Sequence, residues 1–554
     1  RIVCRKMPHW CLGYANLSLR RSKNLLMKKI EAKNKFVIKF ANVNGSGSAS
    51  ANQLFAKGVF RSGITVSPKN IFPSNIQGLP TWFEVRVSEK GYQGRRESVD
   101  IMVAMNPQSY NQDVQEINSG GYLLYDSSWK RDFGRTDINV IAIPLTQLCI
   151  KEFSDSKHRF LFKNIVYVGA LASLLGIDKN IYEVLIGEQF KGKEKLIKPN
   201  VKALRLGFNY AEKNLKDNCA IKVVKSNKTD GMILTSGNHA AGLGCIYGGA
   251  SVCAWYPITP STSLAEAFTS YCEELRIEPK SDKNKFAIIQ AEDELAAIGM
   301  AIGANWNGAR AFTATSGPGI SLMSEFIGLA YFAEVPLVIF DIQRGGPSTG
   351  MPTRTQQSDV LACAYASHGD TKHVLLMPST PKECFDFAAK AFDLADRLQT
   401  PIIVLSDLDL GMNDWTTPEL QWDDSREYDR GKVLSKENLE DLDTWGRYVD
   451  VDGDGIPYRT YPGTHPNKGA FFTRGTSHDE NAKYTEDGKV NAENLSRLLK
   501  KYQTASELVP RPEFKQDSNS SSIGVIYFGS TEASMKETLD MLGKEGIILD
   551  AMRL

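Results

Sequence analysis

The chain has 554 residues, more than one hydrophobic core can serve, so we expect roughly two to four domains. Its 66 Lys and Arg residues nearly balance its 64 Asp and Glu residues, which excludes the strong positive field of a nucleic-acid-binding protein. No apolar run approaches the roughly 18 residues that a membrane-spanning helix needs, so we expect neither nucleic acid nor a membrane as partner.

The nine cysteines are scattered, and no two of them form a C-x-x-C pair. This spacing predicts neither a disulfide framework nor a cysteine-ligated zinc or iron–sulfur site, so we expect no metal on this chain. Reduced thiols are typical of a cytoplasmic protein, which is the location we predict.

The first 35 residues differ from the rest of the chain, because they are basic and no acidic residue precedes Glu31. We interpret residues 1–35 as a non-native or disordered extension, with Met27 as the native start. Residues 36–215 then alternate strand-like and helix-like stretches. Strands are expected over 36–43, 99–105, 120–126 and 138–145, and an apolar helix over 164–177. This alternation predicts an α/β domain whose parallel sheet is covered by helices.

A second α/β domain is predicted over 236–415, after a linker over 216–235. Its strands are expected over 285–290, 309–315, 335–342 and 400–407, and functional loops of such sheets lie at the carboxyl ends of the strands. Residues 416–520 carry many charges and little periodicity, which predicts a loop-rich extension. Residues 521–554 have the pattern of a strand, a helix and a strand, and we interpret them as the incomplete start of a C-terminal α/β domain.

Two short motifs imitate cofactor sites. The turn "NGSGSAS" at 44–50 follows a strand and opens a helix, as a dinucleotide fingerprint does, but Ser50 stands where the third glycine or alanine is expected. We favour a tight backbone turn, with an NAD site as the alternative. The acidic turn "DVDGDG" at 450–455 has Tyr461 where a calcium loop needs glutamate, and its loop-like surroundings do not suit a thiamine diphosphate magnesium site. We therefore expect that this chain does not hold a diphosphate by itself.

The second domain places polar and turn-forming residues after three strands. Glu292, Asp293 and Glu294 follow the first and open a helix of small residues, where the helix dipole favours negative charge. "TSGPG" at 315–319 follows the second strand. The loop "QRGGPSTGMPT" at 343–353 follows the third, and its Arg344 offers a fork that suits a carboxylate.

The stretch "YPITPST" at 256–262 brackets one threonine between two prolines. Because proline fixes its own φ and disfavours helix in the preceding residue, we expect Thr259 to be extended, with its hydroxyl held in one place. Ser263 and Glu266 have the spacing of a capping box for the following helix. A fixed hydroxyl beside a helix N-terminus would suit a carboxylate, and a plain turn is the alternative.

Taken together, "YPITPST", the acidic helix start, "TSGPG" and "QRGGPSTGMPT" resemble the α subunit of 2-oxoacid:ferredoxin oxidoreductases, especially the 2-oxoglutarate type with a γ domain fused at the N-terminus. The resemblance implies a γ domain over 36–215, a thiamine pyrimidine-binding domain over 236–415 and the start of a transketolase C-terminal-like domain over 521–554. It also implies a separate β subunit, in an αβ or α2β2 assembly, that carries the diphosphate, Mg²⁺ and a [4Fe–4S] cluster.

The resemblance further implies roles for individual residues. Glu294, with Glu292 as its rival, would contact N1′ of the thiamine pyrimidine and favour the tautomer that accepts the C2 proton. Thr259, Arg344 and Thr353 would bind the 2-oxoacid. The residues expected to complete the cofactor contacts are Ser316 and Gly317, and those expected to shape the substrate loops are Tyr256, Pro257, Pro260, Ser261, Gly345, Gly346, Ser348 and Gly350.

The function implied by the resemblance is oxidative decarboxylation of 2-oxoglutarate with CoA to succinyl-CoA and CO₂, or the reverse, with electrons passing through the β-subunit cluster to ferredoxin. The polar substrate loop suits a two-carboxylate substrate. Pyruvate or another 2-oxoacid remains an alternative substrate. An NAD-dependent dehydrogenase and a non-catalytic assembly subunit are alternatives of other classes.

Overall fold

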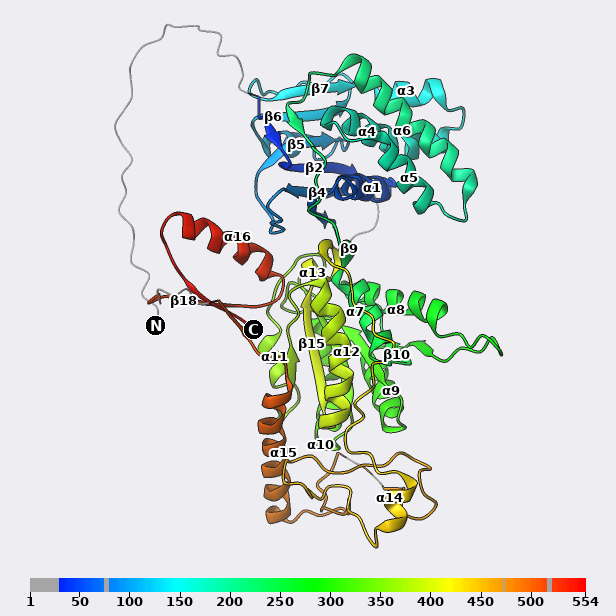
Figure 1. Cartoon of the computed structure of the whole chain (residues 1–554), viewed down its shortest axis with the longest axis vertical. Helices are drawn as coiled ribbons and strands as arrows, with labels where there is room; N and C mark the ends of the chain where they lie inside the picture. Colours follow the sequence, from blue (N-terminus) through cyan, green and yellow to red (C-terminus); the bar gives the residue numbers. More distant parts are fainter. Residues whose placement is uncertain (1–28, 74–78, 472, 474, 516–520) are drawn as a thin grey trace.

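The computed structural model describes residues 29–73, 79–471, 473, 475–515 and 521–554. The predictions for residues 1–28, Met27 among them, lie outside these ranges. Within them the chain forms an upper α/β unit, a lower α/β unit and a small C-terminal unit beside both (Figure 1). The α/β fold class is therefore confirmed.

The upper unit is built on a sheet of six strands. The order is β3 (Thr65–Ile71), β4 (Pro80–Ser88), β2 (Lys35–Val43), β5 (Val99–Ala104), β6 (Ile117–Asp126) and β7 (Asn139–Ile143). β2, β5, β6 and β7 are parallel, as predicted, whereas β4 runs antiparallel to both β2 and β3. Only residues 72–79 connect β3 to β4, and a parallel crossover needs roughly a dozen residues or more, so this half of the sheet is antiparallel.

Six helices belong to this unit: α1 (Ser48–Arg61), α2 (Tyr110–Gln115), α3 (Leu145–Glu152), α4 (Ser156–Leu175), α5 (Lys179–Gln189) and α6 (Glu194–Asn214). The longest two pack closely, because a Cβ on Gly207 of α6 would lie 1.8 Å from the carbonyl oxygen of Val166 in α4. Phe40, Phe55 and Tyr167 are fully buried between the helices and the sheet.

The boundaries of the upper unit differ from the prediction. Residues 30–35 are not an extension, because β1 (Ala32–Lys33) pairs with β8 (Ile221–Lys222) and the backbone N–H of Ile30 donates to Gly120. The predicted linker also contains β9 (Met232–Ser236), which pairs antiparallel with β16 (Asp414–Pro418). Pairing across long sequence distances leaves no local pattern, so these short strands escaped prediction.

The lower unit has a fully parallel sheet of six strands. Its order is β11 (Ala287–Gln290), β10 (Val252–Trp255), β12 (Ala311–Thr315), β13 (Leu337–Gln343), β15 (Pro401–Asp407) and β14 (Val374–Leu376). One face packs on α7 (Gly237–Tyr247), α8 (Thr262–Leu275) and α12 (Pro381–Leu398), and the other on α9 (Glu294–Trp306), α10 (Gly317–Phe332) and α11 (Val360–Ala364). The short α13 (Leu408–Met412) follows β15.

The segment predicted to be loop-rich contains α14 (Lys436–Asp441) and the 21-residue α15 (Gly488–Leu508), which Figure 1 shows along the side of the lower unit. α15 is held there by charge: Arg497 and Lys501 form ion pairs with Glu334, whose side chain is completely buried. These partners lie more than 160 residues apart in the chain, so the charge pattern of the segment alone did not reveal them.

The C-terminal unit consists of β17 (Glu513–Lys515), β18 (Gly524–Tyr527), α16 (Thr531–Lys544) and β19 (Asp550–Arg553). β18 and β19 are parallel, as a strand, helix and strand in succession predict. α16 contacts the upper unit through Arg86 in β4, which donates two hydrogen bonds to the Glu537 carboxylate at 2.7 and 2.8 Å. No helix in the described part of the chain has the length and hydropathy to cross a membrane.

Candidate active site

The loops that follow β10, β11, β12 and β13 meet at one edge of the lower sheet, because the strands are parallel and all end there. These loops carry the residues that the sequence singled out. The arrangement of their side chains decides which of them can act together.

Arg344, at the end of β13, joins two of these loops. Its Nη1 donates to the carbonyl oxygen of Thr259 at 2.7 Å, and its Nη2 donates to the carbonyl oxygen of Thr349 at 3.1 Å. The side chain is nearly buried, and its Nε–H has no hydrogen-bond partner in the described residues. A fixed guanidinium with an unused donor is suited to receive an anionic ligand.

The environment of Arg344 is anionic. Burial lowers the pKa of Arg344, and the negative charges of Asp359 and, to a smaller extent, Glu294 act in the opposite direction. Thr259, Arg344 and Glu294 therefore belong to one local site, although they are separated by up to 85 residues in the chain.

The loop before α8 is ordered by its own hydroxyls. Ser261 and Thr262 donate to the carbonyl oxygen of Ile258 at 3.0 and 3.2 Å. The predicted capping box of Ser263 and Glu266 is wrong, because α8 already begins at Thr262.

Ser263 instead faces the neighbouring helix α7. Its Oγ accepts a hydrogen bond of 2.8 Å from Nδ2 of Asn238, which also donates to the carbonyl oxygen of Pro260 at 2.9 Å. Asn238 thus holds the loop before α8 against α7. Sequence reasoning missed it, although it follows a glycine at a helix N-terminus in "SGNHA".

Glu294 is the first residue of α9, and Asp293 caps that helix by accepting a hydrogen bond of 2.8 Å from the N–H of Ala296. Glu292 points to solvent, whereas Glu294 is only 6% exposed. The Glu294 carboxylate has no hydrogen-bond partner among the described residues. A nearly buried carboxylate without such a partner is suited to a ligand, which favours Glu294 over its rival Glu292.

The "TSGPG" turn requires its glycines. A Cβ on Gly317 would lie 2.7 Å from Oδ2 of Asp359, and a Cβ on Gly319 would lie 1.9 Å from Oγ1 of Thr315 and 3.0 Å from Cγ of Glu294. The hydroxyl of Ser316, the N-cap residue of α10, is buried and has no hydrogen-bond partner in the described residues. The turn therefore packs directly against two acidic side chains and leaves one polar atom for a ligand.

The loop after β13 folds back on itself. The N–H of Gly345 donates to Arg354 at 2.8 Å and its carbonyl oxygen accepts from Met351 at 2.7 Å, while a Cβ on Gly350 would lie 1.9 Å from that oxygen. Gly346 is half-buried, and Ser348 is exposed with φ of 58°. This tight turn keeps the loop against Arg344, whose Nη2 donates to the carbonyl oxygen of Thr349 in the same loop.

Thr353 lies outside this cluster. Its hydroxyl accepts a hydrogen bond of 3.0 Å from Arg354, which also reaches the carbonyl oxygen of Phe72 in the upper unit. Of the remaining predicted loop residues, Pro260 is buried, Tyr256 is half-buried and Pro257 is exposed. The described residues contain no group of three His, Cys, Asp or Glu side chains placed to hold a metal ion.

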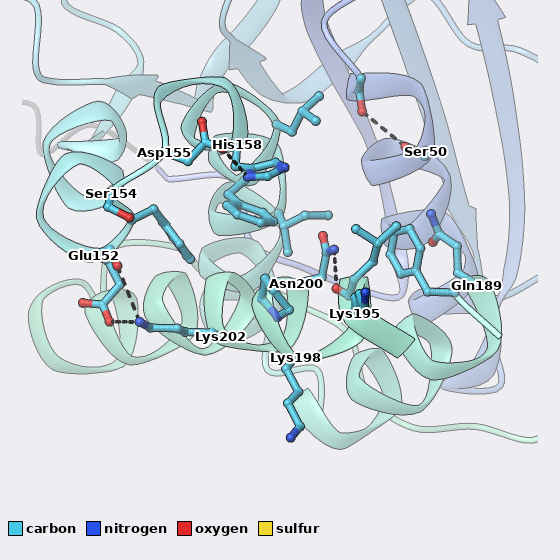
Figure 2. Close-up of a pocket in the computed structure, with 18 residues that line it drawn as sticks. Ser50, Glu152, Ser154, Asp155, His158, Gln189, Lys195, Lys198, Asn200 and Lys202 are labelled. Atoms are coloured by element: carbon cyan, nitrogen blue, oxygen red, sulfur yellow. Dashed lines mark hydrogen bonds and ion pairs between the residues drawn. The ribbon is translucent and has the colours of Figure 1, made fainter. Parts of the chain in front are cut away.

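The glycine-rich turn of the upper unit borders a separate cavity of about 700 Å³, drawn in Figure 2. Gly47 and Ser50 line it, together with an ion pair of 2.8 Å between Glu152 and Lys202. Leu161 packs so closely on Gly47 that a Cβ there would lie 2.6 Å from its Cδ2. β2 and β3, the strands before the turn and after α1, are separated by β4 and so do not form the adjacent parallel pair of a dinucleotide-binding unit, which argues against the NAD alternative.

Comparisons with known families agree with this architecture. The family model described as "Pyruvate ferredoxin/flavodoxin oxidoreductase" matches residues 37–210, and that described as "Pyruvate flavodoxin/ferredoxin oxidoreductase, thiamine diP-bdg" matches residues 243–502. The first range covers the upper unit, and the second covers most of the lower unit with α15.

Individual relatives match along most of the chain. Subunit alpha of 2-oxoacid:ferredoxin oxidoreductase 2 from Aeropyrum pernix is 30% identical, over 91% of this chain and 84% of its own. The 2-oxoglutarate synthase subunit KorA from Methanothermobacter marburgensis is 47% identical, over 31% of this chain and 43% of its own. A solved structure of 2-oxoglutarate:ferredoxin oxidoreductase from Magnetococcus marinus, with 2-oxoglutarate, coenzyme A and succinyl-CoA bound, is 28% identical with a TM-score of 0.83, covering 94% of this chain and 88% of that one.

Proposed function

Since the chain belongs to the family of 2-oxoacid:ferredoxin oxidoreductase α subunits, we propose that it forms part of a 2-oxoglutarate:ferredoxin oxidoreductase. The reaction is the oxidative decarboxylation of 2-oxoglutarate with CoA to succinyl-CoA and CO₂, or its reverse, with electrons delivered to ferredoxin. The observation that carries the proposal is the joining of Arg344 to Thr259 beside Glu294. The relative with 2-oxoglutarate and succinyl-CoA bound supports this substrate over pyruvate.

Arg344 is the proposed partner of the substrate carboxylate. Its two hydrogen bonds to backbone carbonyls fix the guanidinium before substrate arrives, so little ordering is needed on binding. Its unused Nε–H can donate to an anion. Thr259 is the proposed hydroxyl partner of the 2-oxoacid, because its carbonyl already holds Arg344. Thr353, at the far end of the loop over 343–353, is also proposed to contact the substrate.

Thiamine diphosphate is the proposed cofactor, and the residues present fit its pyrimidine ring. Glu294 is a nearly buried carboxylate without a hydrogen-bond partner among the described residues, Ser316 has an unused buried hydroxyl, and Gly317 and Gly319 leave no side chain in the way. When bound, the cofactor supplies a carbon that adds to the 2-oxo group. Glu294 would hold the proton at the ring nitrogen N1′, and Ser316 and Gly317 would position the ring.

The phosphates are assigned to a partner subunit, which we propose carries Mg²⁺ and a [4Fe–4S] cluster in an αβ or α2β2 assembly. The family model for residues 243–502 supports thiamine binding by this chain. The helices beside Glu294 also offer an apolar face for a partner: Met300 of α9, Leu322 of α10 and Leu361 of α11 are 42%, 49% and 74% exposed. These three side chains lie on the helices that cover one face of the lower sheet, and exposed apolar side chains there would suit a protein–protein interface.

The test is to purify the chain with its partner subunit and measure CoA-dependent reduction of a viologen dye. We expect turnover with 2-oxoglutarate that exceeds turnover with pyruvate and needs thiamine diphosphate. The Glu294→Gln variant should lose about 10²- to 10⁴-fold in kcat, the range that general acid–base groups contribute. Equal turnover without thiamine diphosphate, or by Glu294→Gln, would contradict the proposal, and stoichiometric NAD binding would favour a dehydrogenase instead.

A further inference from the structure

The loop that carries Arg344, residues 344–358 between β13 and α11, is closed at its base by a buried glutamine. Gln343 is the last residue of β13, and its Nε2 donates to the carbonyl oxygen of Ser406 in the neighbouring strand β15 at 3.0 Å. Its Oε1 accepts a hydrogen bond of 3.0 Å from the backbone N–H of Asp359. The β13–α11 loop therefore leaves the sheet and returns to it at one fixed point.

Two glutamines near the end of the β13–α11 loop make different contacts. Gln356 is exposed, and its Oε1 accepts a hydrogen bond of 3.2 Å from the N–H of Gly346 within the loop. Gln357 is half-buried, and its Nε2 donates to Oδ2 of Asp407 at 2.9 Å and to the carbonyl oxygen of Phe528 at 3.3 Å. Asp407 ends β15, and Phe528 directly follows β18. The side chain of Gln357 thus joins the loop both to the lower sheet and to the C-terminal unit.

The C-terminal unit makes further contacts at the same place. The Thr531 hydroxyl donates to Oε1 of Gln357 at 3.1 Å, and the backbone N–H of Ser530 donates to Oδ2 of Asp407 at 3.3 Å. Gly529 has φ of 61°, and a Cβ there would lie 2.6 Å from Nε2 of Gln357. The turn between β18 and α16 is therefore shaped to receive this one side chain.

The contact at Gln357 is the stronger of two that hold the loop from outside the lower unit. Asp407 is buried, and its Oδ1 accepts a hydrogen bond of 3.0 Å from the N–H of Leu410 at the start of α13, so it is a fixed anchor. A hydrogen bond to a carboxylate is stronger than one between neutral groups. The upper unit contacts the loop through the exposed Arg354, which donates to the carbonyl oxygen of Phe72 at 3.1 Å.

We propose that the C-terminal unit sets the affinity for the 2-oxoacid, and that Gln357 is the positioning residue through which it holds the β13–α11 loop. This inference rests on the proposed function of Arg344, whose Nη2 is held by the Thr349 carbonyl of that loop. In a protein whose loop is released, only a fraction of the molecules presents Arg344 in the binding geometry, and the apparent Kd rises by the inverse of that fraction. Because the loop is in place once substrate is bound, KM rises while kcat changes little.

The test uses the complex of this chain with its partner subunit. The KM for 2-oxoglutarate is measured by viologen reduction, and calorimetry gives the affinity for glutarate, a dicarboxylate without the reactive keto group. Gln357→Ala removes three hydrogen bonds of the side chain, so we expect KM and the Kd of glutarate to rise on the order of tenfold. Thr531→Val removes one neutral hydrogen bond, so a rise of about two- to fivefold is expected.

Thr538→Val is the matched control in the same helix. Thr538 is exposed, and its hydroxyl donates to the carbonyl oxygen of Ser534 one turn earlier in α16, so KM should stay at the wild-type value. Gln357→Ala combined with Thr531→Val should have the effect of Gln357→Ala alone, because the Thr531 hydroxyl acts through Gln357.

Hydrogen exchange in the same complex reports on the loop without any turnover. The N–H groups of Gly345 and Met351 are hydrogen-bonded within the loop. Peptides that cover residues 345–354 should exchange on the order of tenfold faster in Gln357→Ala, and at the wild-type rate in Thr538→Val.

A wild-type KM in Gln357→Ala would overturn the inference, as would a fall in kcat without a rise in KM, or effects of Gln357→Ala and Thr531→Val that multiply in the double variant. If Gln357→Ala does not assemble, wild-type KM and exchange rates in Thr531→Val would overturn it. A wild-type complex that turns over 2-oxoglutarate, with variants that keep its KM and exchange rates, would contradict this inference alone. A wild-type complex without any 2-oxoacid turnover would contradict the proposed function and this inference with it.

Discussion

Gly319 offers a direct test of how Glu294 is positioned. This glycine lies in the first turn of α10, and a methyl group there would be 1.9 Å from Oγ1 of Thr315 and 3.0 Å from Cγ of Glu294. Real Cβ atoms essentially never come within 3.0 Å of another atom, so Thr315 would have to move by about 1 Å. Thr315 is fully buried at the end of β12, and the added methyl group would also press on Cγ of Glu294 directly, so we expect Glu294 to be displaced.

The expected effects of Gly319→Ala on stability and on activity differ in size. Overpacking costs about 1–3 kcal/mol, and the better helix propensity of alanine offsets about 1 kcal/mol of that. The free energy of unfolding should therefore fall by at most about 2 kcal/mol. A displacement of about 1 Å at a reacting group can lower the rate about 100-fold, so kcat should fall far more than the loss of stability explains.

The assay compares viologen reduction and chemical denaturation for Gly319→Ala and Gly187→Ala. Gly187 lies in α5, and a Cβ added there would meet no neighbouring atom within 4 Å, so alanine should stabilise the protein by about 0.5–1 kcal/mol and leave turnover unchanged. Wild-type kcat in Gly319→Ala would refute the reasoning that this packing places Glu294. Loss of activity only in proportion to loss of folded protein would refute it as well.

Three further outcomes are expected. Glu334→Gln should lower the free energy of unfolding by about 3–5 kcal/mol in urea denaturation, because it leaves Arg497 and Lys501 buried without their counter-charge. A loss below about 1 kcal/mol would show that these two ion pairs contribute little to stability. Burial raises the pKa of Glu334, but the positive charges of Arg497 and Lys501 outweigh burial and lower the pKa to about 2, below its usual value of 4.5. The contribution of ionised Glu334 to the free energy of unfolding is therefore present above pH 4.5 and is lost as pH falls toward 2. Acid titration of stability should therefore be shallower in Glu334→Gln than in the wild type. Arg344→Lys should raise the KM for 2-oxoglutarate at least tenfold with unchanged stability, since an ammonium cannot keep both carbonyl contacts and still present a fork; an unchanged KM would remove Arg344 from the substrate site.

Local patterns in the sequence predicted many of the elements correctly. The strands around 36–43, 309–315, 335–342 and 400–407 are all present, because a buried parallel strand needs a continuous apolar run that the sequence displays. The acidic start of α9 was also predicted, since negative charge at a helix N-terminus is favoured by local interactions.

Two other predictions failed, for different reasons. Ser263 fits a capping box by spacing, but Asn238 of α7 claims its hydroxyl. The sequence of the upper unit suggested a wholly parallel sheet, but the short connection between β3 and β4 reverses one strand. The first contact joins residues 25 positions apart in the chain, whereas β3 and β4 form a hairpin whose strands the sequence patterns did not single out.

The sequence alone determined that this is an α/β chain with polar loops at the strand ends of its second unit, because hydrophobic periodicity and turn residues are local properties. Only the tertiary structure decided that Arg344 is held by the Thr259 carbonyl, and that Glu294 is buried while Glu292 is not. Burial and charge pairing depend on which segments meet in space, and that is set by the packing of the whole sheet with its helices.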